Sequence, residues 1–210
     1  MVDDAGSPAR RRGRPADRDS AETRRAIIDN ARRLFAEGGY SGVTNKAVAD
    51  AAGVTTAALY HYVESKLDLY VLVHRDIQRQ IYGRFQQATA AAETFMGQLE
   101  GVFEGALELE RRDPTLTLFI GTVRTDMRRF PEVRERLSET AAQRDAFFVR
   151  IVDQGVATGE VRPADRPMVV EFLRVMLVGL TEGVSMSQDQ HRLAIDAIRA
   201  ALQGCLIQRA

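Results

Sequence analysis

Apolar side chains recur every three or four residues along most of this chain, which is the spacing of an amphipathic α-helix. No stretch alternates apolar and polar residues for long enough to predict a β-strand. The segment "EGGY" offers a glycine for the left-handed conformation that commonly ends a helix. The first apolar stripe predicts a helix over about residues 20–37 and contains Ile27, Ile28, Ala31, Leu34 and Phe35.

The rest of the pattern predicts an all-α protein of about nine helices. The breaks between them contain Pro, Gly or clustered polar turn formers, as in "RRDP", "RFPE", "ATGEVRPADRP" and "SMSQDQ". We expect a disordered arm over residues 1–19, a three-helix domain over residues 20–66 and a larger helical domain over residues 67–210. After the first helix, the expected helices cover residues 45–51, 56–62, a long segment from Ser65, and residues 93–111, 115–128, 132–157, 165–185 and 189–207.

Two of the short helices carry capping signals. Thr44 and Thr55 each precede a helical run, where a threonine hydroxyl can accept a hydrogen bond from a backbone N–H of the first turn. The flanking apolar pairs at hydrophobic-staple spacing are Val43 with Val48 and Val54 with Leu59. Gly53 lies between the helices, where a tight turn is needed. Two stapled helices joined by about four residues around a glycine predict a helix-turn-helix.

The second of these helices has small residues first and three rings last, in "TTAALYHY". In a helix-turn-helix the second helix enters the major groove with its N-terminus first. Residues 55–58 are small enough to let the backbone approach base edges, and the rings follow about one turn later, near the phosphates of the groove walls. Packing of a tyrosine ring beneath the small domain is the alternative. The expected contacts are Thr55, Thr56, Ala57, Tyr60, His61 and Tyr62.

Two lysines stand at helix starts, where the helix dipole disfavours a cation. "SKLD" predicts a capping box that uses Asp68, with Ser65 as the N-cap and Lys66 at the first helical position. That position is favourable if a phosphate docks there and takes both the free N–H groups and the ammonium. Lys46 raises the same question in its own helix. A solvated lysine at each place is the alternative.

The N-terminal arm contains "RRRGRP" directly before the small domain. Four arginines without an acid, interrupted by Gly and followed by Pro, suit an extended segment that enters a narrow minor groove. A solubilising tail is the alternative. The expected minor-groove contacts are Arg10, Arg11, Arg12 and Arg14.

Composition mainly excludes classes of protein. The formal net charge is +0, so the distribution of charge carries the information. The single cysteine, Cys205, excludes an internal disulfide but leaves a bridge between subunits open, and three scattered histidines predict no metal or cofactor site. The most apolar run, "VVEFLRVMLVGL", is broken by Glu171 and Arg174, so we expect no membrane span. Without a secretory signal, we expect a cytoplasmic protein.

The segment "AIIDNARRLFAEGGYSGVTNKAVADAAGVTTAALYHYVESKLDLY" resembles the N-terminal domain of TetR-like transcriptional regulators. The resemblance implies a homodimeric repressor with an N-terminal DNA-binding domain and a C-terminal ligand domain. It also implies DNA contacts by Thr44, Thr55, Tyr60, His61 and Lys66. The chain departs from the family pattern at Thr56, Ala58 and Val63. Because of the first two departures, the operator sequence does not carry over. The matching residues are Ile28, Ala31, Leu34, Phe35, Gly39, Tyr40, Thr44, Val48, Ala49, Ala52, Gly53, Val54, Leu59, Tyr60, His61, Tyr62 and Lys66.

The last two helices are the expected dimer interface. The helix over residues 165–185 is apolar nearly all round, and the last helix has one clean apolar stripe. Two such helices per chain can form a four-helix interface with their symmetry mates, and the resemblance implies the same arrangement. The expected interface residues are Val178, Gly179, Gly183, Ala197, Ile198, Ala201, Leu202 and Cys205.

A pocket for a lipophilic or aromatic effector is expected between the middle helices. Glu104 and Arg124 are possible polar contacts within it, although both also suit solvent-facing positions. Plain core packing is the alternative for every apolar candidate. The candidates are Phe95, Leu99, Phe103, Leu107, Leu118, Phe119, Met127, Phe147, Phe148, Ile151, Phe172 and Met176.

Other functions remain as alternatives. A transcriptional activator or a ligand-independent DNA-binding protein would have the same small domain. The fragment "HRD" lies inside a predicted helix and lacks the asparagine of a kinase catalytic loop. An all-α enzyme would depend on acid–base work by Glu104, Glu108 or Glu171, and no hydrolase, zinc-protease or phosphate-binding motif supports one.

Overall fold

The structure is a computed structural model that describes residues 16–138, 141–182 and 188–204. Within these ranges the chain forms α-helices and one short 3-10 helix, η1 (Pro163–Asp165), without any strand, which confirms the all-α prediction. The α-helices are α1 (Ala16–Gly42), α2 (Asn45–Ala51), α3 (Thr56–Leu59), α4 (Lys66–Thr89), α5 (Phe95–Arg112), α6 (Pro114–Arg129), α7 (Pro131–Ser138), α8 (Ala141–Ala157), α9 (Arg166–Glu182) and α10 (Gln188–Leu202).

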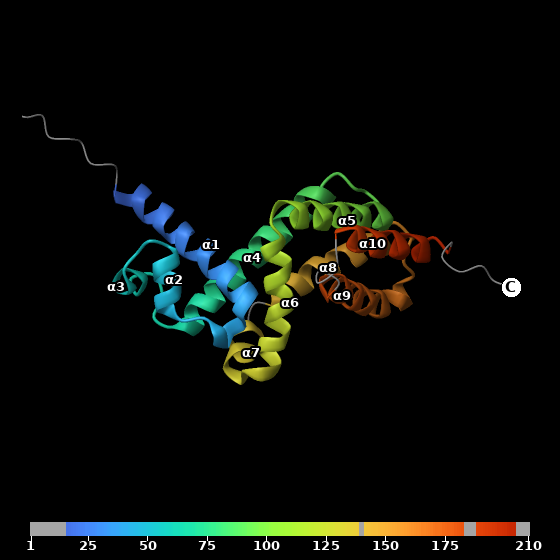
Figure 1. Cartoon of the computed structure of the whole chain (residues 1–210). Helices are drawn as coiled ribbons and strands as arrows, with labels where there is room; N and C mark the ends of the chain where they lie inside the picture. The colour runs from blue at the N-terminus through green and yellow to red at the C-terminus, as the bar shows by residue number, and fades with distance from the viewer. Residues whose placement is uncertain (1–15, 139–140, 183–187, 205–210) are drawn as a thin grey trace, which may run out of the picture.

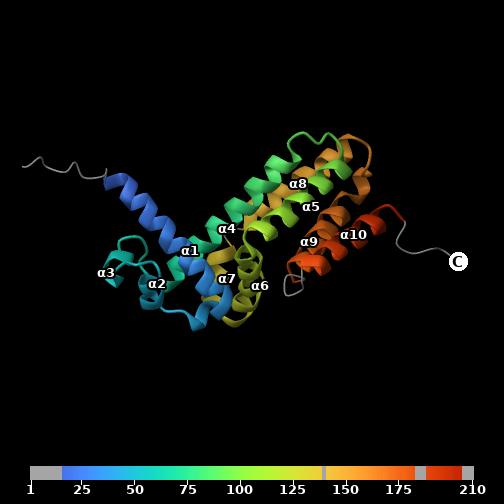
Figure 2. The ribbon, with the colours of Figure 1, turned by 45° about the horizontal axis from the view of Figure 1, so that its top comes forward.

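The helices gather at two ends of an elongated molecule (Figure 1). One end contains α1, α2 and α3, and the other contains α5, α8, α9 and α10. The long helix α4 runs from the first end into the second, alongside α5 and α8 (Figure 2). Helix α6 stands between the two ends and packs most extensively on α1.

Two hydrophobic cores correspond to these ends. The first joins α1, α2, α3 and the start of α4 to α6 and α7, and its centre is the fully buried Tyr70. The ring of Tyr70 lies 4.9 Å from that of Phe35 on α1 and 5.1 Å from that of Phe119 on α6. Burying each such ring stabilises the fold by about 2–3 kcal/mol. The second core joins the end of α4 to α5, α8, α9 and α10 around Phe103, Phe148 and Ile151.

Helix α1 begins earlier than the apolar stripe predicts. It starts at Ala16, so residues 16–19 are helical and the expected disordered arm does not extend to residue 19. The chain turns at Gly39, which has φ 64°, a value that glycine adopts without strain.

Helix α3 is shorter than predicted. It ends at Leu59, and Tyr60, His61 and Tyr62 follow in tight turns whose N–H groups bond to carbonyls three or four residues earlier. The three rings therefore do not continue the helix. Leu59 and Val63 are both buried in the first core, and the tight turns bring them to the same side.

The predicted helix over residues 132–157 is two helices. Helix α7 packs Val133 and Leu137 on the first core, whereas α8 packs Phe147 and Phe148 on the second. Residues 139–140, between these two helices, lie outside the described residues, and neither is Gly or Pro. The two halves of the predicted helix pack on different cores, which periodicity alone did not show.

Candidate nucleic-acid interface and ligand cavity

The α2–α3 unit has the capping predicted from its sequence. Thr44 Oγ1 accepts a hydrogen bond of 3.1 Å from the Ala47 N–H, and Thr55 Oγ1 accepts one of 3.1 Å from the Ala58 N–H. Gly53 makes the turn between the helices with φ 69°. Each cap uses only a lone pair, so the exposed threonine O–H remains able to donate to a phosphate oxygen.

The face of α3 divides into one anchor and several accessible residues. Leu59 is fully buried in the first core, whereas Ala57 and His61 are exposed and Thr56 is half-buried. The Tyr60 ring is 51% exposed, and its hydroxyl accepts a weak hydrogen bond of 3.3 Å from Asn45 Nδ2 at the start of α2. This position keeps Tyr60 on the surface of the α2–α3 unit.

Tyr62 has a different environment from Tyr60. It is half-buried against the first core, and its hydroxyl lies 3.4 Å from Ser20 Oγ on α1. The sequence left open whether either ring packs beneath the small domain, and the structure answers differently for each. Tyr62 combines packing with an accessible edge, whereas Tyr60 faces outward.

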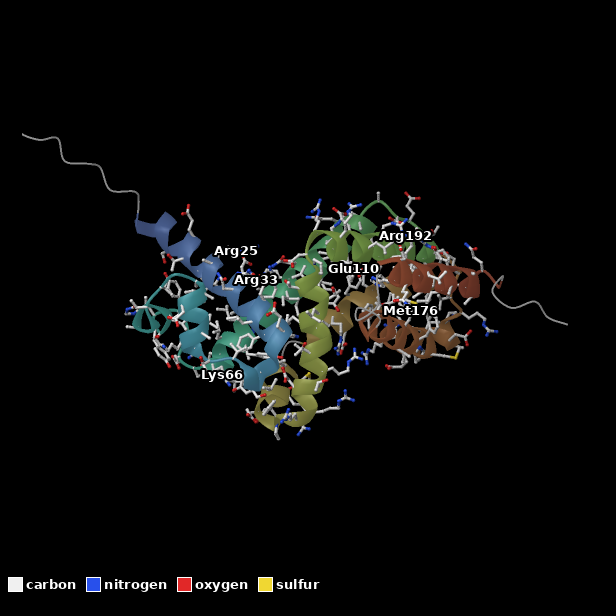
Figure 3. The ribbon with its side chains drawn as sticks, in the orientation of Figure 1. Arg25, Arg33, Lys66, Glu110, Met176 and Arg192 are labelled. Carbon is white, nitrogen blue, oxygen red and sulfur yellow. The ribbon has the colours of Figure 1, made fainter. Side chains whose placement is uncertain are left out.

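Lys66 is the first residue of α4 and lies at the same end of the molecule (Figure 3). Ser65 caps this helix by accepting a hydrogen bond of 3.1 Å from the Asp68 N–H. The Ser65 hydroxyl also donates to Asp68 Oδ2 at 2.7 Å, and this bond, together with Arg136 at 2.8 Å, holds the pKa of Asp68 below its usual value. Lys66 Nζ lies 4.4 Å from the centre of the Tyr40 ring, which directs the ammonium along the surface.

The remaining expected DNA contacts lie on either side of this unit. Lys46 is exposed in the first turn of α2. Arg10, Arg11, Arg12 and Arg14 lie outside the described residues. The capped turn, the outward Tyr60 and Lys66 thus form the part of the predicted interface for which the structure gives a geometry.

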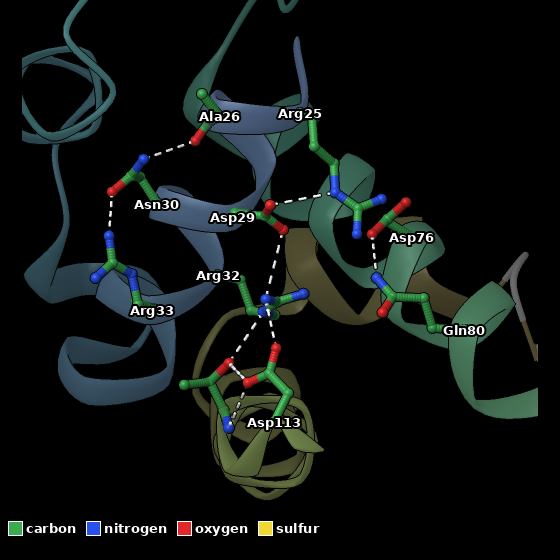
Figure 4. A network of polar contacts seen from close by, with 10 residues as sticks. Arg25, Ala26, Asp29, Asn30, Arg32, Arg33, Asp76, Gln80 and Asp113 are labelled. Carbon is green, nitrogen blue, oxygen red and sulfur yellow. Dashed lines mark hydrogen bonds and ion pairs between the residues drawn. The ribbon is translucent and has the colours of Figure 1, made fainter. Parts of the chain in front are cut away.

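Helix α6 is fastened to the end that contains α1, α2 and α3 by two buried polar groups. Arg32 on α1 donates to Asp113 Oδ2 at 2.6 Å and to Thr115 Oγ1 at 3.0 Å, at the start of α6 (Figure 4). Near the other end of α6, Asp126 Oδ2 accepts from the Tyr40 N–H at 2.9 Å and from the Tyr70 hydroxyl at 2.7 Å. Burial raises the pKa of Tyr70 far above its usual value, so its hydroxyl stays protonated and donates.

A mainly apolar cavity of about 260 Å³ lies between α4, α5, α6, α8, α9 and α10. Its lining includes residues from α6, so the helix fastened to the end that contains α1, α2 and α3 also forms a cavity wall. The apolar walls include Ile81, Phe85, Leu109, Ile120, Leu177 and Leu180. The polar lining consists of Gln78, Thr117, Arg124, Arg144, Arg174 and His191.

Among the predicted apolar pocket residues, Phe148 lines this cavity, and so does the possible polar contact Arg124. Leu118 and Phe172 are surface side chains because they lie on the outward faces of α6 and α9. Leu107 lines a second, polar cavity of about 250 Å³ with Glu104 and Glu108. The others fill the cores, with Phe119 and Met127 in or against the first, and Phe95, Leu99, Phe103, Phe147, Ile151 and Met176 in the second.

Sequence analysis missed most of the polar lining. Arg174 had a signal, since it interrupts the most apolar helix of the chain. Arg144 and Gln78 stand in polar stretches and have no such signal. His191 on α10 bonds through Nδ1 to Glu110 on α5, and this buried pair separates the two cavities. A contact between residues so far apart in the chain is not visible in a sequence pattern.

An exposed apolar stripe runs along α9. Met168, Phe172 and Val175 are 65%, 45% and 69% exposed, and the exposed Gly179 continues their spacing. Leu193 on α10 is 68% exposed. Of the predicted interface residues, Ala201 is exposed and Ala197, Ile198 and Leu202 are half-buried. The side chain of Val178, and Gly183 and Cys205 as a whole, lie outside the described residues.

Within the described ranges, no three His, Cys, Asp or Glu residues come together as a metal site would need. None of the described helices combines the length and apolar character that a membrane span requires.

Comparison with known proteins places this geometry in a family. Residues 27–73 match the family described as bacterial regulatory proteins, tetR family. The HTH-type transcriptional repressor KstR2 of Mycolicibacterium smegmatis is 31% identical over 158 residues, which cover 73% of this chain and 75% of the relative.

Solved structures share the fold. The ketosteroid transcriptional regulator KstR2 of Mycobacterium tuberculosis superimposes with a TM-score of 0.63 at 20% identity and covers 86% of this chain and 93% of that one. FadR of Bacillus subtilis, solved with stearoyl-CoA, gives a TM-score of 0.70 at 20% identity, with 86% and 98% covered. Together with the exposed helix-turn-helix, these matches show that the chain belongs to the tetR family of bacterial regulatory proteins and is a DNA-binding transcriptional regulator rather than an enzyme.

Proposed function

We propose that the protein is a homodimeric repressor that binds a palindromic operator and leaves it when a small, mainly apolar effector fills the α6-lined cavity. The observation that carries the proposal is the accessible α2–α3 unit, in which Ala57 and Tyr60 face outward beside Lys66. Repression is supported by the name of the KstR2 relative. The operator of such a repressor lies on chromosomal DNA, so we place the protein in the cytoplasm.

The docking expected for this unit places α3 in the major groove. The small side chains at the start of α3 let its backbone approach the bases, and Thr56 and Ala57 are the expected base contacts. Thr44, Tyr60 and Lys66 would contact phosphates on the groove walls, and the arginines of the N-terminal arm would enter the adjacent minor groove. His61 and Tyr62 are placed to contribute at the same edge.

The apolar stripe on α9 supports the homodimer. Exposed apolar side chains at helical spacing cost free energy in water, and a second copy of the chain can cover them. Gly179 on the same stripe lets two helices approach closely. The symmetry of such a dimer would place two α3 helices in successive major grooves, which explains the expectation of a palindromic operator.

The connection through α6 supports effector control. The same helix lines the cavity through Ile120 and contacts the DNA-binding end through Asp126. A ligand that favours one position of α6 therefore shifts the population of the two DNA-binding domains toward a spacing that does not fit the operator. FadR, which shares the fold, was solved with stearoyl-CoA, and that relative supports an apolar effector.

The test is selection of duplexes bound by the full chain from genomic fragments, followed by footprinting and transcription from the recovered promoter in vitro. We expect two inverted half-sites centred about 10 base pairs apart, or a multiple of this. We also expect transcription to fall as protein is added. A single half-site would contradict the dimer, and rising transcription would contradict repression.

A further inference from the structure

The charged groups that line the α6 cavity all have the same sign. Arg124 comes from α6, Arg144 from α8 and Arg174 from α9, and none of the aspartates or glutamates that the structure describes lines the cavity. These three residues are called the arginine cluster below. Arg124 and Arg174 are half-buried and Arg144 is exposed, so three guanidinium groups from three helices meet at the solvent-accessible part of a mainly apolar lining.

Two partly exposed carboxylates pair with Arg144 and Arg174, and the buried Glu110 bonds to the lining residue His191. Asp145 lies 3.1 Å from Arg144 and 3.4 Å from Arg174, and Glu171 lies 3.1 Å from Arg174. The side chain of Asp145 is 34% exposed and that of Glu171 is 65% exposed, so solvent screens both. The Nε atom of Arg174 is buried and has no hydrogen-bond partner within the described part of the chain. This donor suits an anion that enters the cavity.

On α4, the polar lining residue Gln78 contacts a neutral histidine. Gln78 lines the cavity, and its Nε2 lies 3.3 Å from Nε2 of the buried His74. Burial, with help from the charges of Arg144 and Arg75, lowers the pKa of His74 to about 4. His74 is therefore neutral at pH 7, and the arginine cluster supplies the positive charge at this wall.

The opposite walls accept an apolar group. Ile81, Leu109, Ile120, Leu177 and Leu180 contribute aliphatic surface. The volume of about 260 Å³ lies just below the roughly 300–1,000 Å³ of typical ligand sites. A compact apolar body fits there, with any larger portion reaching out through the opening.

From this division of the lining, we propose that the cavity binds an amphipathic anion, whose apolar body packs on the aliphatic walls and whose carboxylate or phosphate is held by the arginine cluster. The inference deepens the proposed function, on which it rests, by naming the chemical class of the effector. Guanidinium groups bind both kinds of anion through paired hydrogen bonds.

The test uses two fluorescent dyes that share an apolar skeleton. Anilinonaphthalene sulfonate carries an anionic group, and N-phenylnaphthylamine is its neutral counterpart. We expect the full chain to bind the sulfonate about tenfold more tightly, because hydrogen bonds from charged groups contribute at this level. Equal affinity for the two dyes, or no binding of either, overturns the proposal.

Single variants locate the anion. Arg124→Gln and Arg174→Gln should each weaken sulfonate binding about tenfold and leave the neutral dye unaffected, which also shows that the cavity is still folded. Arg128→Gln is the matched control, since this exposed arginine lies on α6 outside the cavity lining. Unchanged sulfonate affinity in both cavity variants overturns the proposal. Filling the cavity with Ile120→Trp should reduce binding of both dyes.

Competition then separates the two sources of the anion. Displacement of the sulfonate dye by decanoate assigns a carboxylate to the arginine cluster, whereas displacement by decanoyl-CoA alone assigns a phosphate. Equally effective displacement by the neutral decanol overturns the proposal. DNA affinity without ligand is measured in parallel. If dye binding fails while operator binding is intact, this inference fails and the proposed repressor function stands.

Discussion

Individual side chains at the DNA-binding end combine a structural role with an accessible polar group. Thr44 and Thr55 cap their helices through oxygen lone pairs and still present O–H donors. Tyr60 meets Asn45 through its hydroxyl, while about half of the side chain remains exposed. A substitution at such a residue should therefore weaken DNA binding without lowering stability only where the structural role of the side chain is small.

Lys66 is the residue where this separation should be clearest. Loss of its charge at the start of α4 relieves about 0.3–1 kcal/mol of repulsion from the helix dipole. The lost contact with the Tyr40 ring costs about 0.5–1 kcal/mol, so the two nearly cancel. We expect Lys66→Ala to keep the melting temperature but to weaken binding to all sequences and lower the salt slope by about one.

Fluorescence anisotropy with specific and random duplexes at several salt concentrations measures this effect. Arg111→Ala, an exposed arginine in the last turn of α5, is the control and should bind DNA normally. An unchanged salt slope for Lys66→Ala would show that this lysine contacts no phosphate.

His74 should make folding stability depend on pH. Its pKa is lowered to about 4 in the folded protein, so the unfolded chain binds a proton between about pH 6.5 and pH 4 that the folded chain does not. Stability from this residue is complete above pH 6.5 and is lost as pH falls, by about 3 kcal/mol in total. In urea unfolding across this range, His74→Gln should show a shallower decline, and an identical decline would contradict the assignment.

Among the elements, α6 has the most connected position. It begins at the Asp113 cap held by Arg32, lines the cavity along its middle, and holds the Tyr40 turn through Asp126 near its end. Because polar and apolar contacts share this one helix, it cannot shift in the ligand domain without moving the turn that precedes α2.

Removal of the Asp126 carboxylate tests this connection. Asp126→Ala leaves the buried Tyr70 hydroxyl and the Tyr40 N–H without their acceptor, so we expect a loss of about 2–4 kcal/mol in the free energy of unfolding. Urea denaturation measures it. Asp50→Ala, at an exposed position of α2, should change stability by less than about 0.5 kcal/mol. A loss as small as that control would mean that the contacts of Asp126 do not fasten α6.

At the scale of the whole molecule, the two cores are joined by α4 and by the short α5–α6 connection at Asp113. The apolar stripe on α9 lies at the end opposite the helix-turn-helix (Figure 1). A dimer formed through this stripe would leave both DNA-binding ends accessible. Ligand binding inside the ligand domain would then change their separation rather than block their surfaces.

The stripe gives a prediction about assembly. Val175→Glu places a charge in the proposed interface, where burial without a partner is costly, so the chain should become monomeric. Sedimentation velocity measures the mass, and affinity for the full operator should fall to that of a half-site. Ala157→Glu on the exposed end of α8 should stay dimeric. A dimeric Val175→Glu protein would place the interface elsewhere.

Local features were predictable because they depend on residues within about four positions of each other. The caps at Thr44 and Thr55, the turn at Gly53 and the buried Leu59 all follow from short-range hydrogen bonding and helical periodicity. The amphipathic stripes likewise identified most helices, although not where packing moved an end. The resemblance of this one segment also pointed to the family.

What tertiary structure decided depends on how helices far apart in sequence pack. The stretch predicted as one helix over residues 132–157 contributes α7 to the first core and α8 to the second. Phe95 and Phe103 fill the second core rather than line the cavity, while Arg124, Arg144 and Arg174 meet at its wall. Periodicity shows which face of a helix is buried, but only the crossing of several helices determines whether that face meets a packed core or a cavity.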